Sequence, residues 1–406
     1  MHDSQHILRP SANMKILVTD GNSRAALAVV RSLGSLGHEL FVASTRSQSI
    51  ASCSRYCSYK LSYPDPTIDR AAFIKSLLNS VIEHDIDILL PITDVSIFPV
   101  AEHLESFNAY CCVPISSLKS LLRAANKQDI FELADELGVP VPSSITINNA
   151  EQCLSALKNL QFPVVIKPTR SRVKDGTGWL NTGVDYADSA DELMVKIRSL
   201  SQVVFPVSLQ ERIVGAGIGL FYCFNQGQPI SVFSHRRLHE KPPSGGVSVL
   251  RESVTPDPQA EAFGILLLRE LEWHGVAMVE FKVDRRDNKL KLMEINGRFW
   301  GSLQLAIDSG VDFPKQLIDV ANGQIDFTSS DYKLGVRSRW FWGEVDLLLL
   351  YLLKSKKTLK LPPDHDPRYI SILKTINPYV PRQKMEVLRL SDIKPWLYET
   401  LNWFKN

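Results

Sequence analysis

The sequence predicts three regions in order: an α/β domain with a Rossmann-like parallel sheet, an α+β region, and a mostly helical C-terminal region. The first region is indicated by a strand–helix–strand pattern over residues 14–43, which is typical of a parallel α/β unit. The second is indicated by a hairpin pattern over residues 276–295. The third begins after about Phe327, where apolar helical segments and several tryptophans gather.

Composition limits the classes of function. The chain has 406 residues, enough for two or three domains, and 46 Lys plus Arg against 44 Asp plus Glu give a net charge of +2. This balance gives no global reason to expect nucleic acid as a partner. No apolar run approaches the roughly 20 residues of a membrane span. We expect the run 345–353 to be a buried helix, with a membrane-surface role as the alternative.

The N-terminal residues and the cysteines indicate a cytoplasmic protein. Residues 1–13 are polar and lack the apolar centre of a signal peptide, so we expect a disordered extension, with Met14 as an alternative start. The six cysteines form no paired Cys-x-x-Cys motifs, which favours free thiols in a reducing compartment over a zinc site.

The first strand–helix unit lacks a dinucleotide-binding fingerprint. Its turn reads Asp20-Gly-Asn-Ser-Arg24 rather than Gly-x-Gly-x-x-Gly, which argues against NAD binding. A later strand over residues 86–91 leads to Thr93 and Asp94. These two residues are expected at a helix cap or, because loops after parallel strands line ligand crevices, beside a substrate.

The middle of the chain alternates helices and strands. The expected elements are helices over 126–137 and 150–160, a strand over 162–168, and strands beginning at 203 and 220. Asn126 is the expected cap of the first helix. Lys167 ends the strand and precedes the loop 169–178, where Gly176 and Gly178 would let backbone amides fold over phosphates.

Polar and apolar side chains alternate along the second strand of the predicted hairpin. Residues two apart in a strand share one face. Glu294, Asn296 and Arg298 should therefore point one way, while Met293 and Ile295 point into a core. A strand rarely lines up an acid, an amide and a cation unless a ligand lies on that face.

The first strand of the hairpin adds a second acid to the same face. Antiparallel pairing joins like faces, so Glu280 should lie near Glu294 and Asn296. Two carboxylates and an amide oxygen suit Mg²⁺ together with phosphate oxygens. The alternative is a solvated sheet face on which Glu280 pairs with Lys282 or Arg298.

Further cations accompany these acids. Lys167 at its strand end can neutralise a phosphate, and Lys127 lies in the first turn of its helix, where a cation is unfavourable unless an anion is near. Either is otherwise a surface lysine. The basic cluster 235–241 is compatible with nucleic-acid binding, with a solvated strand end, or with cations aimed at a phosphate or carboxylate.

Together these residues resemble the ATP-grasp superfamily, in particular its carboxylate–amine ligases. The motifs in family order are Asn126-Lys127, Val165-Ile-Lys-Pro168, Gln210-Glu-Arg-Ile-Val-Gly215, His235-Arg-Arg237 with Ser244-Gly-Gly246, Val279-Glu-Phe-Lys282 and Met293-Glu-Ile-Asn-Gly-Arg298. The last two motifs are the specific ones, and the resemblance covers about residues 15–323.

The resemblance implies a domain order. It places an extension over 1–13, a pre-ATP-grasp α/β domain over 14–120, an ATP-grasp domain over 121–326 with subdomains 121–205 and 206–326, and a helical region over 327–406. ATP would lie between the two α+β subdomains.

The resemblance also implies residue roles. The expected ATP-binding residues are Lys127, Lys167, Gln210, Glu211, Arg212, Ile213, Gly176 and Gly178. The expected ligands of Mg²⁺, or of Mn²⁺ in its place, are Glu280, Glu294 and Asn296. The expected catalytic residues are Arg298, Arg236 and Lys167, with Ser244 and Arg251 as further contacts. One departure concerns ribose, because the segment 215–219 lacks the acid that many family members place there.

The implied reaction is ATP-dependent ligation. A small-molecule carboxylate would form an acyl phosphate, which an amine then attacks to give an amide or peptide-like bond with ADP and phosphate. The alternatives are a carbamoyl-phosphate-synthase-like or carboxylase-type enzyme, or a nucleotide-binding module without turnover. Arg337 and Arg339 are expected to hold a carboxylate or to form structural pairs. We expect no nucleic-acid partner and no membrane span, and a homodimer is a possible assembly.

Overall fold

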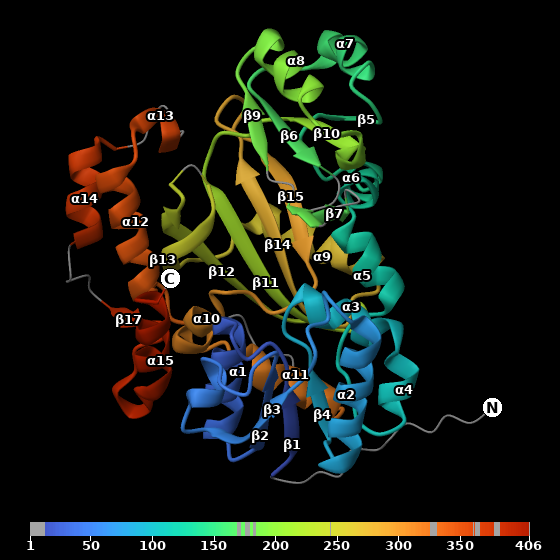
Figure 1. The fold of residues 1–406 in the computed structure, drawn as a ribbon, viewed down its shortest axis with the longest axis vertical. Coiled ribbons are helices and arrows are strands. Elements are labelled where there is room, and N and C mark those ends of the chain that lie inside the picture. The colour runs from blue at the N-terminus through green and yellow to red at the C-terminus, as the bar shows by residue number, and fades with distance from the viewer. Residues whose placement is uncertain are drawn as a thin grey trace. The chain divides into compact units, whose positions relative to one another are not determined.

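The computed structural model describes residues 13–168, 172–174, 179–181, 184–243, 245–324, 331–359, 361, 366–376 and 382–405 (Figure 1). The predicted contacts at Gly176, Gly178 and Ser244 lie outside these residues. The chain divides into two compact units. Unit 1 comprises Met1–Arg123, Ile218–Val279 and Ile295–Asn406, and unit 2 comprises Ala124–Gly217 and Glu280–Glu294.

The N-terminal part of unit 1 is the predicted parallel sheet. Its strands are β1 (Lys15–Val18), β2 (Glu39–Ser44), β3 (Cys57–Ser62) and β4 (Ile88–Leu90), in the order β3-β2-β1-β4. Residues alternate between two cores: Ile16 and Val18 pack with α1 (Arg24–Ser35), whereas Leu17 packs with α2 (Arg70–Glu83). Figure 1 accordingly shows α1 and α2 on opposite sides of this sheet.

Short local signals set the helix boundaries in unit 1. The Ser23 hydroxyl accepts a hydrogen bond from the Ala25 amide at the start of α1 (3.2 Å). Asp257 caps α9 (Pro258–Glu270), whose first residue is a proline. Further helices before the C-terminal region are α3 (Asp94–Glu102), α4 (Leu104–Asn108), α5 (Leu118–Ala125), α10 (Leu303–Ser309) and α11 (Phe313–Ala321).

A seven-stranded sheet has the order β15-β14-β11-β12-β13-β16-β17. Its strands are β11 (Gly217–Asn225), β12 (Gln228–Lys241), β13 (Val247–Ser253), β14 (Gly275–Val283), β15 (Leu290–Asn296), β16 (Arg337–Arg339) and β17 (Gln383–Met385). The last two strands come from the C-terminal region. They are three residues long and carry no apolar run, which is why the sequence pattern missed them.

The C-terminal region is otherwise helical, as predicted. Its helices are α12 (Phe341–Leu353), α13 (Lys356–Leu359), α14 (Arg368–Ile376) and α15 (Lys394–Trp403). The run 345–353 is helical as expected, but the expectation that it is buried was wrong for most of it, because one face of α12 packs and the other is exposed. Leu347 is buried, whereas Leu352 and Leu353 are 54% and 76% exposed. Among the described residues, no helix combines the length and hydropathy that crossing a membrane requires.

Unit 2 contains an antiparallel sheet of order β5-β10-β6-β9. Its strands are β5 (Ser144–Ile147), β6 (Val164–Pro168), β9 (Asp185–Ala187) and β10 (Val207–Glu211), and a separate ribbon pairs β7 (Arg172–Lys174) with β8 (Trp179–Asn181). Its helices are α6 (Lys127–Glu136), α7 (Gln152–Ala156) and α8 (Ala190–Arg198). The Asn126 side chain caps α6 by accepting from the Gln128 amide, as predicted.

Two predicted elements of unit 2 are shorter than expected. The helix over 150–160 is reduced to α7 followed by a 3₁₀ turn, Leu157–Asn159. The strand expected from Val203 begins only at Val207, after the 3₁₀ turn Gln202–Val204. Pro206 explains the second difference, because proline cannot donate to a strand ladder.

Candidate functional site

Three lysines and one acid form a charged cluster in unit 2. Lys167 at the end of β6 is half-buried, and its Nζ donates to Gln210 Oε1 on the neighbouring strand β10 (2.5 Å). Burial and the charges of Lys127 and Lys282 together lower the pKa of Lys167 to about 7, against the opposing charge of Glu294. The cluster therefore holds more positive than negative charge around a desolvated amine.

The segment predicted to border adenine lies on β10 and just after it. Glu211 is buried, and both of its carboxylate oxygens have protein partners: the Ser143 amide (2.8 Å) and Arg286 (2.8 Å). Arg212 lies over the Tyr186 ring at 4.8 Å, and Ile213 is buried. A ligand beside this segment would meet backbone groups and the apolar Ile213 side chain rather than the Glu211 carboxylate.

The glycine-rich segment after β10 approaches the hairpin closely. A Cβ on Gly215 would lie 1.7 Å from the Val283 carbonyl oxygen. The Val283 amide also donates to the Ala216 carbonyl (3.0 Å), and the Arg285 amide donates to that of Val214 (3.1 Å). This approach is a structural reason for glycine at the position where the sequence lacks the ribose-binding acid.

The hairpin strands β14 and β15 are neighbours in the seven-stranded sheet, as predicted. Glu280 is buried on β14, and Glu294 is half-buried on β15. The expectation that Met293 packs in a core was wrong, because Met293 is half-buried and Leu292 is buried instead. In the part of the chain that the structure describes, no group of three or more His, Cys, Asp and Glu side chains has a metal-binding arrangement.

In unit 1, Arg298 lies two residues after β15 and has three protein partners. Its Nε donates to Asp94 Oδ2 (2.8 Å), and its two terminal nitrogens donate to the Phe299 carbonyl (3.0 Å) and to Asn296 Oδ1 (3.3 Å). Thr93 occupies the N-cap position of α3 without a side-chain bond. Asp94 thus orients Arg298 instead of capping the helix.

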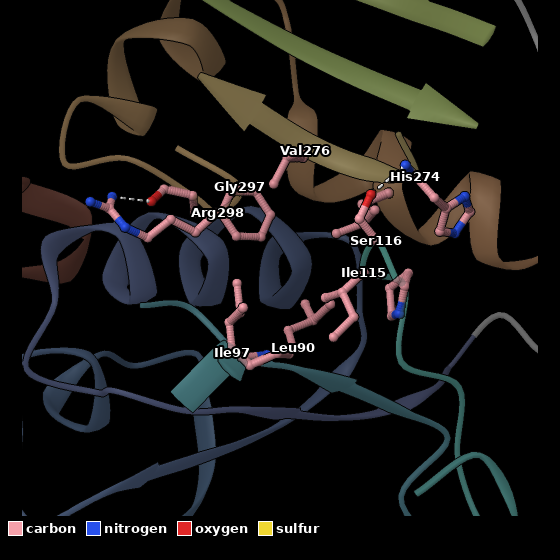
Figure 2. Close-up of a pocket in the computed structure, with 12 residues that line it drawn as sticks. Leu90, Ile97, Ile115, Ser116, His274, Val276, Gly297 and Arg298 are labelled. Atoms are coloured by element: carbon pink, nitrogen blue, oxygen red, sulfur yellow. Dashed lines mark hydrogen bonds between the residues drawn. The ribbon is translucent and has the colours of Figure 1, made fainter. Parts of the chain in front are cut away.

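Figure 2 shows Arg298 at the edge of an apolar cavity whose other labelled lining residues include Leu90, Ile97 and Ile115. The cavity measures about 10 Å³, which is about the smallest space that can hold one water molecule. It is therefore a packing gap and not a ligand pocket. The Arg298 side chain extends away from this apolar lining in Figure 2.

A second arginine in unit 1 belongs to a three-residue ion network. Arg236 on β12 and Arg337 on β16 both pair with Glu252 (2.5 and 2.8 Å). Burial opposes ionisation of Glu252, but hydrogen bonds from both arginines outweigh it and lower the pKa of this carboxyl. Arg337 is thus in a structural pair, whereas the Arg236 side chain is still 60% exposed.

The prediction that Arg251 contacts a ligand directly is wrong. Its side chain is 1% exposed and pairs with Glu386, which also pairs with Arg24 (2.9 Å). The guanidinium instead joins the large sheet to the C-terminal region. Arg339 on β16 is also buried, which leaves it little surface for a ligand.

The basic cluster over 235–241 is not a continuous positive surface. His235 is buried, and its Nε2 lies 2.9 Å from Ser302 Oγ. Burial lowers the pKa of His235 well below its ordinary value, so the ring is neutral. His239 pairs with Glu344 (2.9 Å), and Lys241 pairs with Asp346 (2.5 Å). The alternative of a solvated strand end was wrong for His235.

The sequence motifs did not lead us to expect a site role for Lys282. The signal was present, because Lys282 lies two residues after Glu280 on β14 and alternation predicts that they share a face. Its influence on the pKa of Lys167 identifies it as a member of the cluster.

Comparison with solved structures identifies the fold. An ADP complex of N5-carboxyaminoimidazole ribonucleotide synthetase has a TM-score of 0.64 at 15% identity, over 84% of this chain and 85% of that chain. Biotin carboxylase from Campylobacter jejuni gives 0.62 at 15%, over 80% and 74%. L-amino acid ligase from Bacillus licheniformis gives 0.58 at 15%, over 77% and 75%. No family model matches the sequence. The chain has the ATP-grasp fold.

Proposed function

We propose that this protein is an ATP- and Mg²⁺-dependent ligase that joins a small-molecule carboxylate to an amine. The observation that carries the proposal is the charged cluster of unit 2. Lys167 is desolvated beside Lys127 and Lys282, with Glu294 as the opposing charge. Such a cluster suits a ligand with several negative charges, since each added anion would relieve repulsion among the lysines.

The donor set also fits nucleotide and metal. Glu280 and Glu294 lie on neighbouring strands, and Asn296 follows Glu294 by two residues on β15. Carboxylate and amide oxygens are ligands that Mg²⁺ accepts together with phosphate oxygens. The backbone of 210–213 would border the base, because the Glu211 carboxylate is already bonded to Ser143 and Arg286.

Each group of residues would have a separate task. When bound, MgATP supplies the phosphoryl group that activates the carboxylate. Lys167 and Lys127 would hold phosphate oxygens as point charges, and Glu280, Glu294 and Asn296 would hold the ion. Arg298, which Asp94 orients through its Nε, would stabilise negative charge on the transferring oxygens.

The test is ADP release by the full chain with MgATP and pools of carboxylates and amines. A ligase should release ADP only when both a carboxylate and an amine are present, and Lys167→Met and Glu294→Ala should each abolish that release. ADP release that is independent of any substrate would point to a simple ATPase. Nucleotide binding without release under all pools would favour a module without turnover.

A second candidate activates bicarbonate in place of an organic carboxylate. It is favoured by two structural neighbours, a biotin carboxylase and an N5-carboxyaminoimidazole ribonucleotide synthetase. Bicarbonate-dependent ADP release in carbonate-depleted buffer would support this candidate. Release that is unaffected by bicarbonate would exclude it.

A further inference from the structure

A cavity outside the charged cluster lies within unit 1, between the start of α1 and the C-terminal helices. It measures about 520 Å³, a size typical of small-molecule sites. Its lining includes two charged residues, Arg24 and Glu399. It also includes four aromatic residues, Trp340, Trp342, Tyr398 and Trp403. Gly301, three residues after Arg298, also lines it.

The polar atoms of the aromatic side chains that line the cavity already form hydrogen bonds within the protein. Indole N–H groups donate from Trp340 to Glu399 Oε1 (2.8 Å), from Trp342 to Thr400 Oγ1 (3.0 Å) and from Trp403 to Asp346 Oδ1 (2.8 Å). The Tyr398 hydroxyl donates to the Gln48 carbonyl. These four rings therefore offer a ligand mainly carbon surface, which favours an apolar or aromatic body.

One carboxylate oxygen of a lining residue is unpaired: Glu399 Oε2 is buried and accepts no hydrogen bond from the described residues. Because this oxygen is buried, a ligand in the cavity would contact it only after the carboxylate turns toward the cavity. Arg24, in contrast, is satisfied on two sides: it pairs with Glu386 (2.9 Å) and lies 3.7 Å from the centre of the Trp340 ring. When Glu399 is ionised, this unfilled acceptor calls for a donor with positive charge, because a buried unpaired carboxylate is costly.

We propose that this cavity binds an organic amine with an aromatic or apolar body, whose ammonium group donates to Glu399. The identification of this amine as the attacking substrate rests on the ligase function proposed above. The proposal that the cavity binds an amine does not depend on that function. In the sequence, only two residues separate Arg298 from Gly301 of the cavity lining.

Burial raises the pKa of Glu399 to about 7, despite its hydrogen bond with Trp340 and the charge of Arg24. The charge of Glu386 contributes to this raised pKa, and the charge of Arg31 opposes it. An ammonium group beside Glu399 would favour its ionised form. Amine binding should therefore weaken as the pH falls from 8 to 5.5, since protonation of Glu399 removes the charge that attracts the ligand.

The test measures tryptophan fluorescence and calorimetry on the full chain without nucleotide. Three probes share one aromatic ring: phenethylamine (cation), 2-phenylethanol (neutral) and 3-phenylpropionate (anion). We expect phenethylamine to bind at least about tenfold more tightly than 2-phenylethanol at pH 8, the worth of one hydrogen bond to a charged group. We expect 3-phenylpropionate to bind most weakly.

Glu399→Gln should remove the preference for phenethylamine and its pH dependence, while unchanged binding of 2-phenylethanol shows that the variant is folded. Tightest binding of 3-phenylpropionate by the native chain would overturn the proposal and make Arg24 the recognition residue. Failure of all three probes, or a phenethylamine preference that survives Glu399→Gln, would also overturn it. Normal probe binding without ADP release would leave this site intact and count against the ligase function alone.

Discussion

Proton uptake on nucleotide binding tests the charged cluster directly. With a pKa of about 7, Lys167 is about 10% protonated at pH 8 and about 90% protonated at pH 6. A bound polyphosphate would favour the charged amine and raise this pKa. Nucleotide binding should therefore be accompanied by proton uptake when the pH is above the pKa of Lys167. We expect about 0.9 proton per site at pH 8 and about 0.1 at pH 6 from this lysine.

The assay is calorimetry of MgATP binding in two buffers that differ in ionisation enthalpy, repeated at pH 6, 7 and 8. Lys167→Arg is the matched control, because arginine keeps a positive charge but stays protonated throughout this range. Subtracting its uptake from that of the native chain removes protons that belong to the nucleotide. Equal uptake by the native chain and Lys167→Arg at pH 8 would show that Lys167 does not gain a proton when the nucleotide binds.

Three further substitutions test separate parts of the account. Glu294→Gln keeps the shape of the side chain but removes the charge of a proposed Mg²⁺ ligand, so a Mg²⁺ titration of nucleotide binding should require at least about tenfold more metal. An unchanged midpoint would remove Glu294 from the proposed site. Glu386→Ala leaves the buried Arg251 guanidinium without its counter-charge. It should lower the free energy of unfolding, measured by denaturant unfolding, by about 3–5 kcal/mol. A loss under about 1 kcal/mol would show that Arg251 does not depend on this ion pair. Gly215→Ala places a Cβ 1.7 Å from a carbonyl oxygen, whereas the Cβ of the control variant Gly217→Ala meets nothing within 4 Å. Only Gly215→Ala should therefore lower the melting temperature markedly. Equal melting temperatures of the two variants would show that the close approach at Gly215 is absent.

Much of the fold could be predicted because its signals are local. The start of α1 after Ser23 and of α6 after Asn126 follow from side chains that accept backbone hydrogen bonds within a few residues. The β15–β14 pair follows from alternation and a short turn. Such features depend on neighbouring residues and hence are visible in the sequence alone.

The elements that were missed depend on distant partners. The strands β16 and β17 exist because they pair with β13 and with each other, and their own residues, such as Arg337 and Arg339, do not indicate a strand. The exposed face of α12 was missed for a related reason: an apolar run such as 345–353 does not reveal which of its leucines find a partner.

The sequence indicated which residues belong to the candidate site, but it did not indicate all of the contacts that these residues make. Motif order pointed to Lys167, Glu280 and Glu294, but it did not reveal that Glu211 is fully bonded within unit 2. Nor did it reveal the cavity at Glu399, because its lining is contributed by parts of the chain more than 300 residues apart, from Arg24 to Trp403.

The most direct test of the central claim is MgATP binding by calorimetry, with Glu294→Ala beside the native chain. We predict micromolar binding by the native chain that is lost without Mg²⁺ and lost in Glu294→Ala. A well-folded native chain that fails to bind ATP at millimolar concentration, or that binds it equally well without Mg²⁺ and without Glu294, would contradict a metal–nucleotide site on β14 and β15.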